Sequence, residues 1–314
     1  MQGFTTNLVI FIIMGCGWYL KRVGKLTPPG LKDINGLLFS LLMPIGFFKA
    51  GLAFNPDSLH GWHFALVLLG AYVVSLAAAW IVSGQQKISR RRRAVSMLTG
   101  ARPNVIFIGL PVMTLWLGAA GTEAMLIYVA VCTPFFNVMP LICAQLALTG
   151  SFEPAAVKNA VVKTLKNPIL IAGISGILIA AFGWTHFIPK WTMQTLKVLA
   201  DCSNGLALIV IGASLMPERL ASDIKTAWPD LLMKLFIHPA IIMAAFLLFP
   251  MKNSPVLMQV AVVASSISPA FNCYILAEGL GMDGEYAALN IAASTMLAML
   301  TSLFWMEMSL RFLV

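Results

Sequence analysis

The feature that most constrains this chain is a series of long apolar runs without a charged residue. Two examples are Leu126–Phe152 and Asn253–Ala277. A helix needs about 20 apolar residues to cross the roughly 30 Å hydrocarbon core of a bilayer. Only 11% of the 314 residues are charged and 59% are hydrophobic, whereas soluble domains carry about 25% charged residues. The chain is therefore predicted to be an all-α polytopic membrane protein, which excludes soluble enzymes, nucleic-acid-binding proteins and secreted disulfide scaffolds.

The stretches between charged clusters give ten candidate transmembrane helices. They cover residues 4–20, 33–54, 61–83, 94–117, 122–149, 168–185, 192–216, 230–250, 255–280 and 286–310. The connecting segments are short and rich in turn residues, as in Thr27–Gly30, Gly118–Gly121 and Gly281–Gly284. The apolar runs are continuous and do not alternate with period two, so transmembrane strands are not expected.

The basic residues predict the orientation of the chain in the membrane. If the N-terminus lies outside, fourteen basic residues fall in cytoplasmic segments, and three (Lys190, Lys252 and Arg311) fall on the other side. Cytoplasmic loops carry an excess of Lys and Arg, so both termini are expected to be periplasmic or extracellular. The net charge of +9 therefore reports topology rather than a surface that binds nucleic acid.

Two short patterns occur twice, which indicates an internal repeat. Leu117-Gly118-x-x-Gly121-x-x-Ala124 matches Leu280-Gly281-x-x-Gly284-x-x-Ala287, and a looser Asp/Asn-Gly-Leu pattern near residue 35 returns near residue 204. We expect a first five-helix repeat at 1–149, a cytoplasmic linker at 150–167 and a second repeat at 168–314. Because each half crosses the membrane an odd number of times, the second half must be inverted, as in many secondary transporters.

The fourth and ninth predicted helices each contain proline within a polar cluster. Helix four includes Pro103 and Asn104, and helix nine includes Pro269 with Ser265, Ser266, Ser268 and Asn272. Proline removes a backbone donor and disrupts the preceding turn, and in a membrane the freed groups need protein or water as partners. A simple kink satisfied by neighbouring helices is one interpretation. The other is a pair of broken helices that cross near the midplane and bind substrate.

These residues resemble a known family. Arg102-Pro103-Asn104 followed by Gly109-x-Pro111 is similar to the fourth helix of auxin efflux carriers, whose bacterial members are often described as malate or malonate permeases. Weaker similarities extend over essentially the whole chain, at Lys166-Asn167-Pro168, Ser203-Asn204-Gly205, His238-Pro239 and Pro269-Ala270-Phe271. The family is related to the bile acid:sodium symporter superfamily. Arg102 departs from the pattern, because the family more often has an uncharged residue there.

The resemblance implies two inverted five-helix repeats whose helices 4 and 9 cross at their proline breaks. It also implies a scaffold of helices 1, 2, 6 and 7, which often dimerises, and a transport bundle of helices 3–5 and 8–10. Residues carried over by motif are Pro103, Asn104, Gly109 and Pro111 in helix four and Pro269 in helix nine. Together with Arg102, Ser265, Ser266, Ser268 and Asn272, they form the predicted substrate site.

Arg102 is the charge that most needs a reason, because an arginine at mid-membrane costs about 2.5–3.5 kcal/mol on insertion scales. Its planar guanidinium suits a carboxylate substrate. A structural arginine paired with a carbonyl or a buried acid is the alternative. Asp201, Asn204 and His238 are candidates for proton or sodium coupling. For Asp201, pairing with Lys197 is equally plausible, and His238 can instead be a packing residue.

We therefore expect a transporter of a small organic anion in a bacterial inner membrane, working by alternating access. The substrate would be a dicarboxylate such as malate or malonate, or an auxin-like carboxylate. The alternatives are a sodium-coupled symporter of the bile-acid type and, further away, a passive channel or sensor. No protease or metal motif is found, so neither catalysis nor a cofactor beyond H⁺ or Na⁺ is expected.

Overall fold

A computed structural model describes residues 2–52, 61–150, 168–215, 220–251, 254–270 and 272–314, together with Glu218 and scattered residues between 154 and 166. Every regular element within these residues is helical. The principal helices are α1 (Gln2–Arg22), α2 (Pro28–Leu37), α3 (Met43–Leu52), α4 (Gly61–Gln85), α5 (Arg90–Gly100), α6 (Leu110–Thr149), α8 (Pro168–Ala181), α9 (Lys190–Ser214), α10 (Leu220–Leu232), α11 (His238–Leu248), α12 (Pro255–Ser265), α13 (Asn272–Gly279) and α14 (Gly284–Phe312).

Six helical segments are long and apolar enough to cross a membrane, among the residues that the structure describes. They are Pro28–Leu52, His63–Gln85, Val105–Thr133, Lys190–Ala213, Leu220–Leu248 and Gly284–Phe312. The segments Val138–Thr149, Ile171–Ala181 and Pro255–Ser265 are apolar but shorter. The all-helical membrane fold is thus confirmed, whereas the ten crossings and the inverted repeat stay predictions.

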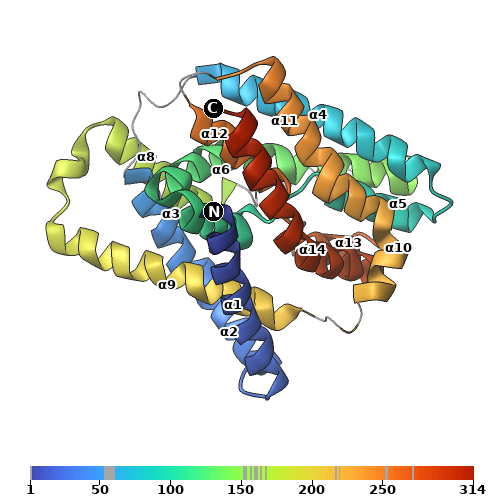
Figure 1. Ribbon diagram of the computed structural model, residues 1–314, viewed down its shortest axis with the longest axis horizontal. Helices are drawn as coiled ribbons and strands as arrows, with labels where there is room; N and C mark the ends of the chain where they lie inside the picture. The colour runs from blue at the N-terminus through green and yellow to red at the C-terminus, as the bar shows by residue number, and fades with distance from the viewer. Residues whose placement is uncertain are drawn as a thin grey trace. The chain divides into compact units, whose positions relative to one another are not determined.

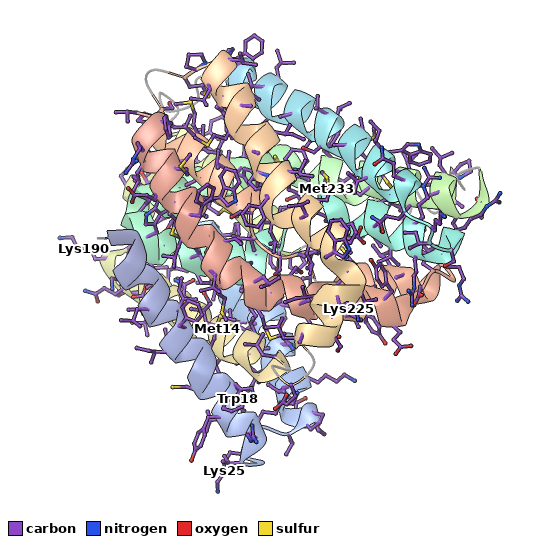
Figure 2. The ribbon with its side chains drawn as sticks, turned by 45° about the vertical axis from the view of Figure 1, so that its right-hand side comes forward. Met14, Trp18, Lys25, Lys190, Lys225 and Met233 are labelled. Carbon is purple, nitrogen blue, oxygen red and sulfur yellow. The ribbon has the colours of Figure 1, made fainter. Side chains whose placement is uncertain are left out.

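The first of two compact units contains residues 1–60, 106–130 and 163–215. In this unit α3 packs on α8 and α1 packs on α9, and Figure 2 labels Met14 and Trp18 along α1. Helices α1 and α9 approach closely because their contact contains glycine. A Cβ atom on Gly212 would overlap the carbonyl group of Met14, and one on Gly17 would overlap that of Ile209. Small residues allow such close backbone packing between membrane helices.

The second unit contains residues 61–105, 131–162 and 216–314. Helix α4 packs against α5 and α11, and α14 packs against α10, α12 and α5. In Figure 1, α11 (orange) lies between α4 (cyan) and α14 (red). Helices α10 and α11 form one continuous segment, joined by the π-helical turn η6 (Met233–Ile237). Buried apolar residues of α12, such as Val260 and Val263, contribute to the core of this unit.

Three helices begin earlier than the sequence predicted, and polar residues cap two of them, α2 and α5. Thr27 caps α2 by accepting a hydrogen bond from the amide of Gly30 at 3.3 Å, with prolines at the first helical positions. Ser89 caps α5 in the same way, through the amide of Arg92. Helix α10 begins at Leu220, ten residues before the predicted start at residue 230. Side-chain oxygens and proline at these positions are typical helix-start signals.

The repeated glycine pattern corresponds to a shared backbone feature. Gly118 has a φ of 62° at a kink within α6, and Gly281 has a φ of 71° before α14. This left-handed conformation is accessible to glycine at little steric cost. Turns were predicted at both places, and both are found. A positive φ is thus common to the two copies of the glycine pattern.

Candidate functional site

The two proline segments lie side by side within the second unit. Helix α5 ends at Gly100 and helix α12 ends at Ser265, and each is followed by a short non-helical stretch. Pro103 and Pro269 face each other as an antiparallel bridge. The amide of Asn104 donates to the carbonyl of Ser268 at 2.8 Å, and the amide of Ala270 donates to the carbonyl of Arg102 at 3.2 Å. We call this structure the proline bridge.

The proline bridge explains how two broken helices are tolerated in an apolar interior. Each proline lacks a donor and interrupts its own helix, and the backbone groups freed nearby would be costly without partners. Two main-chain hydrogen bonds between the broken segments satisfy part of this need. The predicted breaks in helices four and nine, and their contact, are therefore seen in the structure.

Arg102 is buried at the proline bridge, with a side chain only 5% exposed. Its guanidinium lies within hydrogen-bonding reach of the thiol of Cys273, at the beginning of α13. The Cys273 thiol also approaches the carbonyl of Leu98 at 3.8 Å. The arginine is therefore held inward among the helix ends and does not extend to the surface.

Lys234 places a second buried cation at the same location. Its side chain is 1% exposed, and its ammonium donates to the carbonyl of Ser265 at 2.8 Å. Ser265 is the last residue of α12, and the carbonyl end of a helix attracts cations. Lys234 was not among the site residues predicted from the sequence. The sequence feature that could have indicated its role is the position of a lysine within an apolar run of helical length.

The predicted serines differ in what their hydroxyl groups contact. The hydroxyls of Ser265 and Ser266 donate to the carbonyls of Val262 and Val263 at 2.6 and 2.8 Å, so they close the last turn of α12. The hydroxyl of Ser268 is buried and has no hydrogen-bond partner among the described residues. Asn104 is also buried, and its backbone amide donates to the carbonyl of Ser268. The side chain of Asn272 lies outside the described residues.

Other predicted site residues belong to the first unit. Gly109 ends the π-helical turn η3 (Val105–Gly109), and Pro111 lies in the first turn of α6. Asp201 forms a 2.9 Å ion pair with Lys197, one turn earlier on α9, and both side chains are more than half exposed. This geometry is the pairing alternative considered from the sequence, and an exposed pair of this kind contributes little stability.

The first unit also contains a cavity of about 280 Å³ in which several polar residues meet. Asn204 lines it, and Thr114 and Thr122 approach each other there, with hydroxyl oxygens 2.9 Å apart. The charged residues of the lining are Lys49, Glu123 and Asp201. The cavity therefore has charges of both signs, in contrast to the two cations at the proline bridge.

His238 is completely buried at the start of α11, where its ring meets the ring of Tyr72 edge-on at 4.8 Å. Neither ring nitrogen has a hydrogen-bond partner among the described residues. A proton relay requires partners within hydrogen-bond reach. The geometry favours the packing interpretation, and a coupling role for His238 stays a prediction.

A carboxyl group that sequence reasoning overlooked lies at the centre of a buried polar network. Asp230 on α10 is 3% exposed. Its Oδ2 accepts hydrogen bonds from the hydroxyl of Ser96 at 2.6 Å, the hydroxyl of Tyr286 at 3.0 Å and the amide of Asn290 at 3.2 Å. The Asn290 amide also donates to Thr99 Oγ1 at 3.2 Å. We call this group the Asp230 network.

A second acid lies at the edge of the same region, where α14 begins. Asp283 caps α14 by accepting from the amide of Tyr286 at 3.0 Å, and it pairs with Arg92 at 3.0 Å. Partial burial raises the pKa of the Asp283 carboxyl, but the hydrogen bond from Tyr286 and the hydrogen bond and charge of Arg92 outweigh it, so the pKa lies below its ordinary value. The guanidinium of Arg92 also lies 5.1 Å from the ring centre of Tyr286.

Metal coordination has little support within the described residues. They contain no group of three or more histidine, cysteine, aspartate or glutamate side chains arranged to hold a metal ion. The described cysteines are all free, and Cys132 and Cys273 are buried. The chemistry of the proline bridge is thus that of cations, hydroxyls and amides.

Comparison with known proteins shows that the chain is similar to membrane transporters. The family model described as "Membrane transport protein" matches residues 3–147 and 153–306. A Rhizobium meliloti (strain 1021) protein, provisionally named a malonate transporter, is 26% identical over 310 residues, covering 94% of this chain and 93% of that protein. An uncharacterized transporter of Methanocaldococcus jannaschii is 23% identical over 304 residues, covering 95% and 96% of the two chains.

A more distant similarity connects the chain to plants. Auxin efflux carrier component 7 of Arabidopsis thaliana is 21% identical over 141 residues, which cover 44% of this chain and 22% of the plant protein. The matched family segments include both proline segments and both glycine turns. Similarity to membrane transporters therefore extends over almost the entire chain.

Proposed function

Because the chain belongs to the auxin efflux carrier family of membrane transport proteins, we propose that it carries a small organic anion by alternating access. The proposed substrate is a dicarboxylate of the malonate or malate type. The observation that carries the proposal is the pair of buried cations, Arg102 and Lys234, at the point where two broken helices meet.

The two cations suit a dianion for electrostatic reasons. Arg102 offers a planar fork that matches a carboxylate, and Lys234 offers a compact positive charge. Both are almost completely buried, so their field is weakly screened. The amides at the beginning of α13 and the available hydroxyl of Ser268 add donors. The relative provisionally named a malonate transporter supports the same substrate class.

Alternating access would use two inverted repeats of five helices, at residues 1–149 and 168–314, joined by the linker 150–167. The paired proline breaks and the positive φ at both Gly118 and Gly281 support this plan. One compact unit contains α1, α2, α3, α8 and α9, to which we assign the scaffold helices 1, 2, 6 and 7, and it also contains residues 106–130 of predicted helices 4 and 5. We propose that helices 3–5 and 8–10 form the moving bundle and that the scaffold forms a homodimer.

The proposed location is a bacterial inner membrane, with both termini on the periplasmic side. The excess of basic residues in the segments assigned to the cytoplasm supports this orientation. Moving a dianion inward against 100 mV opposes about 4.6 kcal/mol, since each charge is worth about 2.3 kcal/mol. Import would therefore need cotransported cations or exchange, whereas export would not.

A ligand screen tests the proposed substrate class. Malonate and malate are expected to raise the melting temperature of the purified protein, because a ligand that binds only the folded state stabilises it by about 2.7 kcal/mol at a hundredfold excess over Kd. Acetate is expected to have a much smaller effect at equal concentration and ionic strength, since it carries one charge. Equal shifts for acetate and malonate would contradict a site built for a dianion.

A further inference from the structure

The Asp230 network places a carboxyl group in an unusual electrostatic position. Asp230 is 3% exposed, and it forms no ion pair among the described residues. Its hydrogen-bond partners Ser96, Tyr286, Asn290 and Gln86 are all neutral side chains. Burying an ionised carboxylate without a cation is costly, and such a group usually becomes neutral by taking up a proton.

The charged groups around Asp230 are engaged elsewhere. On α5, Arg92 pairs with Asp283 and stacks over the Tyr286 ring. On its own helical segment, Lys234 follows four residues later and donates to the carbonyl of Ser265. Asp223, two turns earlier, accepts from the hydroxyl of Ser222 at 3.4 Å. No basic group therefore neutralises Asp230 directly within the described part of the chain, and Tyr286 is the other titratable group in contact with it.

The hydrogen bonds of Ser96 can serve both charge states of Asp230. The Ser96 hydroxyl lies 2.6 Å from Asp230 Oδ2 and 3.3 Å from the carbonyl of Arg92. When the carboxylate is ionised, Ser96 donates to it. When a proton is on Oδ2, the carboxyl can donate to Ser96 Oγ, and the serine hydrogen turns to the Arg92 carbonyl. A hydroxyl that both donates and accepts permits this exchange without backbone movement.

Asn290 gives a second, independent indication of a neutral state. Its Oδ1 is buried and accepts no hydrogen bond from the described residues, whereas its amide nitrogen bridges Asp230 and Thr99. Buried polar atoms normally have partners. A half-turn of the amide would bring Oδ1 toward Asp230, where it could accept the proton of a neutral carboxyl.

The Asp230 network also lies beside a surface cavity and is connected to the proline bridge. Gln86, whose amide lies 3.5 Å from Asp230 Oδ1, lines an open surface cavity of about 540 Å³ together with Lys87. In the other direction, Asn290 holds Thr99 at the end of α5, and Lys234 holds Ser265 at the end of α12. Asp230 and Lys234, four residues apart on one helical segment, thus contact both broken helices, α5 through Ser96 and α12 through Ser265.

We propose that Asp230 binds and releases a proton during the transport cycle and thereby couples anion movement to the proton gradient. The proposal rests on the transport function proposed above. The cavity beside Gln86 is one route by which a proton exchanges with Asp230, and proton uptake neutralises the carboxylate. The hydrogen bonds from Tyr286 and Asn290 then weaken, because they no longer end on a charge. The hold of α10 on α5 and α14 loosens, which changes the support of both helix ends at the proline bridge.

The test uses the purified chain in sealed vesicles with the membrane potential clamped at zero. Malonate accumulation is driven by an acidic exterior, and malonate counterflow is measured without a pH gradient. Wild-type protein is expected to accumulate malonate by up to about tenfold per pH unit for each coupled proton. Asp230→Asn is expected to lose this accumulation and to retain measurable counterflow. Asp223→Asn, on the same helix, serves as the matched control and should retain both.

The outcomes separate this proposal from the transport proposal. Wild-type counterflow without any response to the pH gradient, or pH-driven accumulation that survives in Asp230→Asn, would overturn proton coupling through Asp230 and leave the transporter intact. Accumulation driven by a sodium gradient alone, and abolished in Asp230→Asn, would also overturn it in favour of a sodium site.

Two further measurements test Asp230 when malonate counterflow is absent or when the Asp230→Asn variant does not fold. If wild-type protein shows no malonate counterflow, infrared difference spectroscopy upon acidification decides. A protonated-carboxyl band that disappears in Asp230→Asn supports the proposal, and an unchanged spectrum refutes it. If Asp230→Asn does not fold, Ser96→Ala replaces it. Removing the shortest hydrogen bond to the carboxylate favours the neutral form, so half-maximal accumulation should move to higher pH, and an unmoved profile would refute the proposal.

Discussion

Replacing Arg102 with alanine is expected to weaken malonate binding by about 30-fold or more. The guanidinium is buried at the proline bridge, where loss of one partner of a desolvated charge pair costs about 2 kcal/mol or more, and about 1.4 kcal/mol corresponds to a tenfold change in Kd. Binding to the purified variant can be measured by isothermal titration calorimetry with malonate.

Two companion variants identify the cause of the loss. Arg102→Lys keeps the positive charge but removes the bidentate fork, so it should recover only part of the affinity. Arg311→Ala removes an exposed cation that is paired with Glu307 on α14, and it should leave the affinity within about twofold of wild type. A small and equal effect of Arg102→Ala and Arg311→Ala would assign Arg102 a purely structural role.

Replacing Lys234 with methionine is expected to weaken malonate binding by about tenfold or more. Methionine resembles lysine in length but has no charge, so the carbonyl of Ser265 loses its donor and the site loses one of its two cations. Hydrogen bonds that involve a charged group contribute about 1.5–3 kcal/mol. The ratio of malonate to acetate affinity should fall as well, which competition binding can measure.

Lys225→Met is the matched control for this change. Lys225 is an exposed lysine on α10, earlier in the same helical segment as Lys234, and its replacement should leave both affinities near the wild-type values. If Lys234→Met lowered thermal stability but kept the malonate-to-acetate ratio, Lys234 would only cap α12. Both variants should be compared by melting temperature before binding is interpreted.

The proline bridge could be predicted from the sequence because its signals are local. Proline affects its own helix wherever it lies, and Pro103 and Pro269 each occur within a polar cluster of an otherwise apolar run. Their contact followed from the expected repeat and from the family resemblance. The glycine turns at Gly118 and Gly281 were visible for the same reason, since a left-handed backbone favours one residue type.

The Asp230 network could not be predicted, because its partners are distant in sequence. Ser96 and Tyr286 are separated from Asp230 by 134 and 56 residues, and nothing local marks them as partners. The start of this helix was also predicted wrongly, because charged residues were taken to mark the ends of helices. Asp230 was placed at the start of its helix, whereas the helical segment begins at Leu220, so the carboxyl lies in the interior of the unit.

The partner of Lys234 could not be predicted from the sequence either. A lysine in an apolar run can extend its ammonium toward water, or it can find an acceptor inside the protein, and the sequence does not distinguish the two. The acceptor is the carbonyl of Ser265, which is available because α12 ends there. Local disruption of one helix thus creates the partner for a residue on another, and only the three-dimensional structure shows both.

The most direct test of transport by alternating access is counterflow of malonate in reconstituted vesicles. Vesicles loaded with unlabelled malonate are diluted into a trace of radiolabelled malonate, without any ion gradient. A carrier exchanges the two, so the label should accumulate transiently inside, with a rate that saturates as external malonate rises. We expect this overshoot for the wild-type chain and its loss in Arg102→Ala. Linear, non-saturating entry of label without an overshoot, in vesicles that contain folded protein, would contradict transport by alternating access.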